Sequence, residues 1–522
     1  MSMLEDTQQQ ASSVNGAGAD RIPVDNPATG EILYEVENMG PARVEELVAS
    51  ARAAQPGWEA LGFERRGEVM YGLRSWLIEN RERVVRMLIA EGGKTREDAL
   101  LAELWYICDS LGFWAKNGPR YLADERIKPH SPLLFGKKVV VRYRALGVIG
   151  VIGPWNYPLT NSFGDAIPAL MAGNAVALKP SEVTPGPSML MKEGLAAAGL
   201  PDGVMQVVTG DGATGAAVID NVDMVMFTGS VATGRKVAAR AAERLVPVSL
   251  ELGGKDPMVV LSDADLERAA NIAVQWAMSN SGQICIAVER VYVEEPVYDE
   301  FVSKVVDKVR SLRQGVPGEP GAVEVGAMTF PPQMEIVERH LRDAVDKGAR
   351  VLVGGSRRPG PGRFFEPTVL TGVDHTMEIM TEETFGPMLP IMKVRDEDEA
   401  VALANDSRYG LNSSVHTRDV ERGERIARRI KAGSTCVNDA LMNYLVQEAP
   451  FGGVGESGIG VRHGAGGIRK YCATQTILIT RFGLKREPTM YPNSRITTKL
   501  FELLMVAMWG RRRRKRARAG GA

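Results

Sequence analysis

VIGVIGPWNYPLTNSFGDAIPALMAGNAVALK, residues 148–179, is the stretch of sequence that decides the fold. Two apolar runs, Val148–Ile152 and 175–178, flank a Gly/Pro turn and a segment with helical spacing at 162–172. Short runs that are apolar throughout are typical of parallel strands, because helices cover both faces of such a sheet. The stretch therefore predicts a strand–helix–strand unit of an α/β fold.

The same alternation continues along the chain. Further strands are expected at 205–208 and 224–227, and helices at 187–198, 212–220 and 234–243. Four such units in succession predict a doubly wound sheet, whose ligand crevice lies at the carboxyl ends of the strands.

Other segments extend this α/β pattern on both sides. Amphipathic helical stretches precede it at 41–58, 64–80, 81–91 and 94–114. After Gly253, strands are expected at 257–261, 290–293, 350–353, 388–394, 413–416 and 435–438, with helices at 266–278 and 297–312. Residues 127–143 predict an extended ribbon, 475–480 a last strand, and the glycine-rich stretch 450–467 a buried loop with close backbone contacts.

Length and composition limit the class of protein. A chain of 522 residues should divide into two or three domains, and 44% hydrophobic with 24% charged residues is ordinary for a soluble globular protein. Four cysteines make no disulfide framework and have no zinc-ligand spacing, so we expect a reducing, cytoplasmic compartment and no metal. Residues 1–20 read as a disordered leader rather than a signal peptide.

Glu251 and Cys285 are the candidate reactive pair. Glu251 ends an apolar run and opens Glu251-Leu-Gly-Gly254, and Cys285 lies among small residues in SNSGQICI, residues 279–286. A thiol with a carboxylate beside it forms a nucleophile with an acid/base partner. The alternative is an inert buried cysteine, which is the role we expect for Cys108, Cys436 and Cys472.

Three further motifs follow expected strands of the doubly wound sheet. Pro154-Trp-Asn-Tyr-Pro158 fixes Asn156 as an amide donor for a developing oxyanion, or is simply a rigid turn. Lys179-Pro-Ser-Glu182 suits ribose hydroxyls, or is a solvated loop. Thr228-Gly-Ser230, with Gly234 after it, suits a pyrophosphate at a helix N-terminus, or is a plain turn.

With these motifs in one order, the sequence resembles the aldehyde dehydrogenase superfamily from about Asn26 to Thr480. The residues that carry the resemblance are Pro154-Trp-Asn-Tyr-Pro158, Lys179-Pro-Ser-Glu182, Phe227-Thr-Gly-Ser230, Glu251-Leu-Gly-Gly254, Gly282-Gln-Ile-Cys285, Glu383-Thr-Phe-Gly-Pro387 and Pro450-Phe-Gly-Gly453. Residues 279–290 are similar to those of bacterial succinate-semialdehyde dehydrogenases and of fatty and aromatic aldehyde enzymes.

The resemblance implies a role for each matching position. Cys285 is the nucleophile that forms a thiohemiacetal and then a thioester, Asn156 with the Cys285 N–H is the oxyanion hole, and Glu251 is the base for hydrolysis. The implied cofactor-binding positions are Trp155, Lys179, Glu182, Gly229, Ser230, Gly234, Glu383 and Phe385.

The resemblance also implies an architecture. The expected fold class is α/β, with a doubly wound parallel-sheet cofactor domain, an α/β catalytic domain and a small β oligomerisation element. The expected boundaries are 1–20 for the leader, 21–126 and 144–252 for the NAD-binding domain, 253–470 for the catalytic domain, 127–143 and 471–490 for the oligomerisation element, and 491–522 for a tail.

The implied function is oxidation of an aldehyde to its acid by an NAD(P)-dependent aldehyde dehydrogenase that forms a homodimer or homotetramer. Glu182 favours NAD, with NADP as the alternative, because a carboxylate there disfavours a 2′-phosphate. An enzyme specific for succinate semialdehyde and a non-enzymatic binding or structural protein on the same scaffold remain alternatives. Glu251 argues against a coenzyme A-dependent acylating enzyme, and the sequence leaves the aldehyde open.

The C-terminal tail lies beyond the resemblance. TKLFELLMVAMW, residues 498–509, is apolar, and 511–518 hold seven of the chain's 63 basic residues. The apolar part is too short to span a bilayer but suits an interfacial helix at an anionic membrane surface. A helix packed on the enzyme body remains the alternative, and contact with nucleic acid is the least favoured.

Overall fold

The computed structural model describes residues 20–510. The predicted leader, except Asp20, and the basic run 511–518 therefore lie outside the described residues. The described chain forms two compact units. The first contains the residues up to Ala123 and Tyr143–Ala473, and the second contains Asp124–Arg142 and the residues from Thr474 onward.

Within the first unit, the strands predicted from the opening stretch form a six-stranded sheet with the order β17-β9-β8-β5-β6-β7. Its strands are β5 (Val148–Ile152), β6 (Ala175–Lys179), β7 (Met205–Val207), β8 (Met224–Thr228), β9 (Val248–Glu251) and β17 (Gly458–Ile459). The first five are parallel, and β17 runs antiparallel to β9. The parallel ordering and the α/β fold class agree with the prediction.

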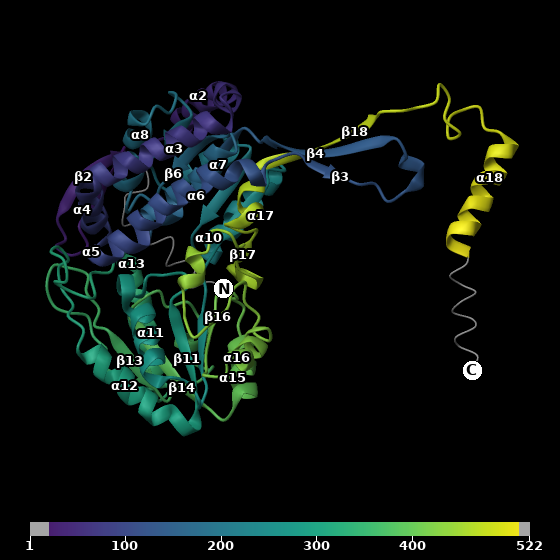
Figure 1. Ribbon diagram of the computed structural model, residues 1–522. Helices are drawn as coiled ribbons and strands as arrows, with labels where there is room; N and C mark the ends of the chain where they lie inside the picture. Colours follow the sequence, from purple (N-terminus) through teal and green to yellow (C-terminus); the bar gives the residue numbers. More distant parts are fainter. Residues whose placement is uncertain (1–19, 511–522) are drawn as a thin grey trace, which may run out of the picture. The chain divides into compact units, whose positions relative to one another are not determined.

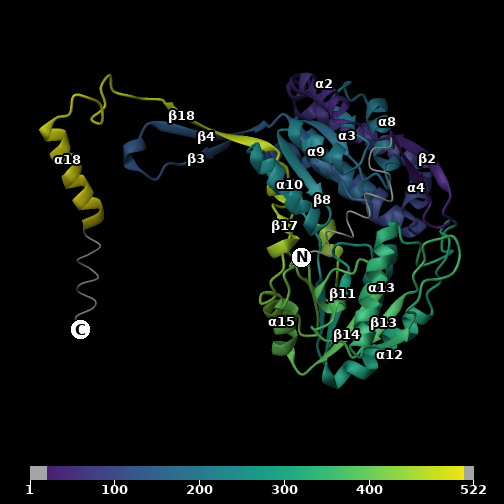
Figure 2. The ribbon, with the colours of Figure 1, turned by 180° about the vertical axis from the view of Figure 1, so that it is seen from behind.

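Helices cover both faces of this sheet, as Figures 1 and 2 show from opposite sides. Alternate strand residues point to opposite faces, so Ile149 and Val151 belong to one hydrophobic cluster and Val148 and Ile152 to another. The first cluster contains residues of α3 (Gly62–Glu79), α4 (Arg81–Gly92), α6 (Tyr106–Tyr121), α7 (Gly164–Met171) and α8 (Gly186–Ala197). The second contains residues of α2 (Pro41–Ala60), α9 (Gly212–Asn221) and α10 (Val231–Glu243).

The second sheet of the first unit has seven strands, in the order β12-β13-β14-β11-β10-β15-β16. The strands are β10 (Asp256–Val260), β11 (Val288–Glu294), β12 (Arg350–Val353), β13 (Thr368–Thr371), β14 (Met388–Val394), β15 (Ser414–His416) and β16 (Cys436–Val437). The helices α11 (Leu266–Met278) and α12 (Tyr298–Arg310) share one hydrophobic cluster with it. A second cluster contains residues of α13 (Pro331–Asp346), α14 (Glu378–Thr381), α15 (Glu397–Asn405) and α16 (Val420–Ala427).

Two predicted helices differ in detail from the observed ones. The expected helix at 94–114 is a short α5 (Arg96–Asp98), a π-helical η1 (Ala99–Trp105) and then α6. The helix expected at 162–172 begins earlier, as the π-helical η3 (Pro158–Phe163). The two π-helical segments are in contact: Oε2 of Glu103 in η1 accepts the N–H groups of Leu159 and Thr160 in η3 at 3.0 and 2.8 Å.

The glycine-rich stretch 450–467 makes the close backbone contacts that its composition predicts. Gly458 has φ 148°, and a Cβ there would lie 2.2 Å from the carbonyl oxygen of Leu250. Only glycine fits this approach, which pairs Gly458 with Glu251 across β17 and β9. The loop that follows therefore passes directly beside the end of β9.

The second unit contains a three-stranded sheet in the order β18-β4-β3 (Figure 1). Its strands are β3 (Glu125–Ile127), β4 (Lys137–Ala145) and β18 (Cys472–Thr480), and β3 and β4 are antiparallel. A helix, α18 (Arg495–Met505), follows, and none of its residues is buried. Among the described residues, no helix has the length and apolar character required to cross a membrane.

Candidate active site

Glu251 and Cys285 are in contact, although 34 positions separate them. Glu251 is the last residue of β9, and Cys285 lies in the loop before β11. The Cys285 thiol faces the Glu251 carboxylate with Sγ 3.8 Å from Oε1, a donor–acceptor geometry suited to proton transfer. The fold thus brings together the thiol and the carboxylate that the sequence singled out.

The loop before Cys285 owes its position to an unusually tight backbone contact. Asn280 and Ser281 have positive φ values of 49° and 56°, and Gly282 has φ 73°. A Cβ on Gly282 would lie 2.1 Å from the carbonyl oxygen of Gly386. Strained backbone of this kind persists only where the surrounding structure holds it, so the loop carrying Cys285 is fixed against the loop at Gly386.

Burial controls the protonation of the pair. Burial raises the pKa of the Cys285 thiol well above its usual value of 9.0, and the negative charge of Glu251 raises it further. Burial also raises the pKa of Glu251, while Arg462 acts in the opposite direction. Cys285 is therefore a neutral thiol at rest, next to a carboxylate that accepts its proton when the thiol reacts.

Asn156 lies in the same cavity as Cys285 and Glu251. Its side-chain Nδ2 donates to the carbonyl oxygen of Gln283 at 2.9 Å. Its own carbonyl oxygen accepts Lys94 Nζ at 2.7 Å and Asn280 Nδ2 at 3.1 Å. These bonds fix the backbone and the side chain of Asn156, which is the preorganisation that an amide donor to an oxyanion requires.

Lys94 and Glu103 form a buried support for Asn156 that was not predicted. Lys94 Nζ lies 2.6 Å from Glu103 Oε1, and neither side chain is exposed to solvent. One lysine thus joins Glu103 of η1 to the carbonyl group of Asn156. The sequence feature that could have indicated Glu103 is its place as the only charged residue in the apolar run ALLAELW, residues 99–105.

Seven of the predicted site residues line one cavity of about 150 Å³. They are Trp155, Asn156, Gly229, Glu251, Cys285, Glu383 and Phe385. The remaining predicted residues lie outside its lining, at or just beyond the carboxyl ends of β6 and β8: Lys179, Glu182, Ser230 and Gly234. Since β6 and β8 both pair in parallel with β5, these strand ends share one edge of the sheet.

The loop carrying Glu383 and Phe385 forms a second wall of the cavity. Phe385 has φ 51° and packs edge-to-face on Trp155, with ring centroids 5.4 Å apart. The N–H groups of Thr384 and Phe385 each donate to Glu289 at 2.9 Å. Glu289 is a further residue that was not predicted, and it pairs with the buried Lys255 at 2.6 Å.

Aromatic side chains and backbone form part of the cavity wall. Trp155 and Phe385 supply aromatic walls, and a Cβ on Gly253 would lie 2.3 Å from Glu383 Oε2, so the backbone reaches the cavity directly. Ser230 caps the N-terminus of α10, and Gly229 precedes it at the end of β8. A glycine turn that opens a helix offers backbone N–H groups to a pyrophosphate.

Lys179 and Glu182 interact with each other rather than with the cavity. Lys179 Nζ lies 2.9 Å from Glu182 Oε2. Burial raises the pKa of Glu383 to about 8, and its Oε1 accepts the N–H of Gly254 at 3.0 Å. Lys179 and Glu182 are thus an ion pair at the carboxyl end of β6, whereas Glu383, with its raised pKa, is largely protonated at neutral pH.

Comparisons with known proteins agree with this site. A family model described as "Aldehyde dehydrogenase family" matches residues 14–477. The "Putative succinate-semialdehyde dehydrogenase [NADP(+)] 2" of Mycobacterium ulcerans is 41% identical over 461 residues, covering 88% of each chain. The "4,4'-diapolycopene aldehyde oxidase" of Methylomonas sp is 40% identical over 475 residues, covering 90% of this chain and 88% of that protein.

A solved structure shares the same fold. It is a point variant of betaine aldehyde dehydrogenase from Staphylococcus aureus in complex with NAD+. The TM-score is 0.84 at 31% identity, and the match covers 89% of this chain and 95% of that chain.

Proposed function

Since the chain belongs to the aldehyde dehydrogenase family, we propose that Cys285, Glu251 and Asn156 carry out its NAD(P)-dependent oxidation of an aldehyde to the carboxylic acid. Glu251 takes the proton of Cys285, and the sulfur attacks the aldehyde carbon. The C–S bond forms as the carbonyl π pair moves to oxygen, which gives a thiohemiacetal. The supporting observation is the 3.8 Å contact between Cys285 Sγ and Glu251 Oε1.

Asn156 stabilises the oxygen that becomes charged in this step. Its amide group has two N–H donors, and one of them bonds Gln283 O. The second N–H and the backbone N–H of Cys285 are the donors to the oxyanion. A fixed amide contributes more in a site closed to water than in solvent.

The hydride lost from the thiohemiacetal carbon, which becomes a thioester, would pass to NAD(P) bound in this site. Trp155, Glu383 and Phe385 hold the nicotinamide side in this proposal. Gly229, Ser230 and Gly234 hold the pyrophosphate, and Lys179 and Glu182 hold the adenosine ribose. The carboxylate of Glu182 favours NAD over NADP.

Hydrolysis of the thioester returns the enzyme to its starting state. Glu251 first releases the proton of Cys285 to solvent; it then removes a proton from water, and the oxygen of that water attacks the acyl carbon. The C–S bond breaks, the carboxylic acid leaves, and the sulfur recovers a proton as the thiol.

Replacement of Cys285 tests this assignment. Cys285→Ala removes the nucleophile, so we expect no NADH or NADPH production with any aldehyde that the wild type accepts. Cys108→Ala, a half-buried thiol on α6, is the control and keeps wild-type turnover. Turnover that persists in Cys285→Ala rejects the proposal.

We propose an apolar aldehyde as the substrate. The hydrophobic cluster that contains Cys285 also contains Ala102, Tyr157, Tyr444 and Phe451. Apolar side chains on the neighbouring segments are exposed: Leu101, Trp105, Met442, Leu445 and Val446. Apolar surroundings of Cys285 suit a long-chain or aromatic aldehyde because the hydrocarbon leaves water on binding.

Succinate semialdehyde is the second candidate, because a relative that is 41% identical carries that name. Its carboxylate needs a cation. The residues described as lining the cavity at Cys285 include neither Lys nor Arg, and the nearby Arg462 already pairs with two carboxylates. The test is kcat/KM for decanal, benzaldehyde and succinate semialdehyde. The apolar assignment predicts the highest values for the first two, and the highest value for succinate semialdehyde overturns it.

We further propose a cytoplasmic homo-oligomer that contacts membrane surfaces through its tail. On α18, Ile496, Leu500 and Leu503 lie on one face, while Arg495, Lys499 and Glu502 lie on another, and none is buried. The seven basic residues in 511–518 add charge that is complementary to anionic lipid.

Co-sedimentation with vesicles that contain phosphatidylserine tests the membrane contact. The full chain should co-sediment and a chain lacking 498–522 should not, while both keep the same turnover with a water-soluble aldehyde. Equal co-sedimentation of the two chains contradicts the contact.

A further inference from the structure

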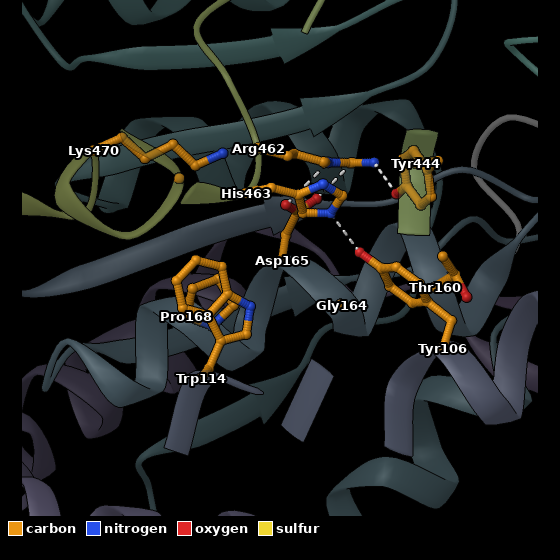
Figure 3. Close-up of a pocket in the computed structure, with 11 residues that line it drawn as sticks. Tyr106, Trp114, Thr160, Gly164, Asp165, Pro168, Tyr444, Arg462, His463 and Lys470 are labelled. Carbon is orange, nitrogen blue, oxygen red and sulfur yellow. Dashed lines mark hydrogen bonds and ion pairs between the residues drawn. The ribbon is translucent and has the colours of Figure 1, made fainter. Parts of the chain in front are cut away.

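Arg462 is a buried arginine that contacts the proposed base and that no motif singled out. It lies in the loop after β17, and its side chain is only 6% exposed. Its Nη1 forms an ion pair with Glu251 Oε2. Its Nε and Nη2 hold both oxygens of Asp165 on α7, at 3.2 and 2.6 Å (Figure 3).

Further acceptors fix the orientation of the guanidinium group. Nη1 donates to Asn161 Oδ1 and to the Tyr444 hydroxyl, both at 2.9 Å. Nη2 donates to Thr228 Oγ1 at 2.5 Å. All three guanidinium nitrogens are thus engaged, with acceptors from several elements, and the planar fork has a single orientation.

We propose that Arg462 is a positioning residue for this reaction: it shares one positive charge between Glu251 and Asp165, and so keeps the base ionised and directed at Cys285. The ion pair holds Oε2 of Glu251, which leaves Oε1 facing the Cys285 sulfur. The inference rests on the proposed role of Glu251.

Removing the charge of either Arg462 or Asp165 should change how readily Glu251 is protonated. Two carboxylates share one guanidinium in this buried cluster. Without Arg462, two unscreened carboxylates would face each other, and Glu251 would take up a proton more readily. Without the charge of Asp165, Arg462 would act on Glu251 alone, and Glu251 would hold a proton less readily.

The other groups around Glu251 do not replace Arg462. Burial lowers the pKa of Lys470 to about 8, so it is still largely charged at neutral pH and also lowers the pKa of Glu251, but its Nζ hydrogen-bonds Ser249 Oγ at 3.3 Å rather than the carboxylate. Burial and Arg462 lower the pKa of His463 to about 3, so the ring that contacts the Tyr106 hydroxyl is neutral. Burial raises the pKa values of Tyr106, Tyr444 and Cys285, so these groups are neutral as well.

The pH dependence of kcat tests the inference, with an aldehyde that gives a burst of reduced cofactor, since hydrolysis by Glu251 then limits turnover. We expect Arg462→Gln to move the acidic limb of the profile up by about one pH unit or more, and Asp165→Asn to move it down. Arg462→Lys keeps the charge, so its limb should lie closer to the wild-type limb than that of Arg462→Gln. A purely structural role predicts lower activity in all three without opposite shifts.

Arg66→Gln is the matched control. Arg66 is also buried, but within residues 20–510 it donates to the carbonyl oxygens of Glu59 and Met171, at 2.8 and 3.1 Å, and not to a carboxylate. Its loss should leave the acidic limb in place. If circular dichroism shows that Arg462→Gln does not fold, the inference is tested by Asp165→Asn alone, whose acidic limb of the kcat profile should move down.

The outcomes separate the two proposals. A wild-type enzyme without activity, or an active Cys285→Ala, contradicts the proposed function. If the wild type is active but the acidic limb of the Asp165→Asn profile stays in place or moves up, only the role of Arg462 is contradicted. The same holds if the acidic limbs of Arg462→Gln and Asp165→Asn move in the same direction.

Discussion

At the scale of single residues, the environment of Cys285 prepares a thiol rather than a thiolate. Burial raises the pKa of Cys285 well above its usual value, and the charge of Glu251 adds to the effect. The sulfur therefore becomes nucleophilic only when its proton moves, and Glu251 Oε1 is 3.8 Å away to receive it. This arrangement limits unwanted reactions of the thiol between turnovers.

Alkylation of the cofactor-free enzyme reports this protonation directly. Because the pKa of Cys285 is raised, the thiol stays protonated through neutral pH and the thiolate fraction keeps growing above it. We expect the rate of iodoacetamide labelling at Cys285, followed by peptide mass spectrometry, to rise up to pH 9 without a plateau. A plateau below pH 8 contradicts the raised pKa.

Asn156→Ala tests the oxyanion donor. Loss of one such donor lowers kcat by about 10²- to 10³-fold in comparable sites. We expect a loss of that size with little change in the KM of the aldehyde, because the donor acts on the transition state. Steady-state kinetics give both values. A higher KM with unchanged kcat would instead place Asn156 in ground-state binding.

At the scale of elements, the site is made by two loops that touch through their backbones. Gly282, before Cys285, packs on Gly386, after Phe385, where a Cβ would be only 2.1 Å from the Gly386 oxygen. Glu289 holds the second loop by accepting the N–H groups of Thr384 and Phe385. The relative position of the thiol and the cofactor wall depends on this contact.

Gly282→Ala should therefore reduce both stability and activity. The new methyl group would meet backbone at a residue with φ 73°, which costs more than about 2 kcal/mol. Gly215→Ala on α9 is the control, since a Cβ there meets no atom within 4 Å. Thermal unfolding and kcat measure both effects. Equal melting temperatures and kcat values in the two variants contradict the account.

The sequence predicts these elements well where the pattern is local. The apolar runs of β5, β8 and β10 and the helical spacing of α11 are each visible in a short window. In contrast, α13 and β13 were not predicted, and neither was β17, which pairs with β9 from about 200 positions away through Gly458.

Partners of the site residues were harder to predict than the residues themselves. Cys285, Glu251 and Asn156 stand in motifs. Arg462, Lys94 and Glu289 act through contacts with residues distant in sequence, for example the ion pair of Arg462 with Asp165. No local spacing encodes such a contact, because only the tertiary fold brings the charges together.

At the scale of the whole molecule, two sheets of the first unit supply different parts of the site, and the second unit has an edge strand of its own. Asn156 follows β5 and Glu251 ends β9 of the six-stranded sheet, whereas Cys285 precedes β11 of the seven-stranded sheet. In the second unit, β18 is an edge strand in which Leu478 and Ile479 are exposed. Exposed apolar edge strands are suited to pairing with another copy.

Leu478→Lys with Ile479→Lys tests this assembly. Added charge on an edge strand opposes pairing, so we expect a smaller species than the wild-type oligomer in light scattering after size exclusion. Leu484→Lys, at an exposed position beyond β18, is the control and keeps the wild-type mass. An unchanged mass in the double variant, or a monomeric wild type, contradicts the proposed oligomer.

The central claim is that Cys285 carries the acyl group and that Glu251 controls its release. Glu251→Gln also removes the acceptor of the Cys285 proton, so the test is run at pH 9, where more of the thiol is ionised and acylation proceeds without that acceptor. Hydrolysis is then slowed by about 10²- to 10⁴-fold, so the acyl enzyme should accumulate when the variant is mixed with NAD+ and decanal. Mass spectrometry of the intact chain and of its peptides measures the adduct. The account predicts an adduct on Cys285 with the mass of the aldehyde less two hydrogens, formed with one equivalent of NADH per site. An adduct on another residue, or NADH formation without any adduct on Cys285, would contradict it.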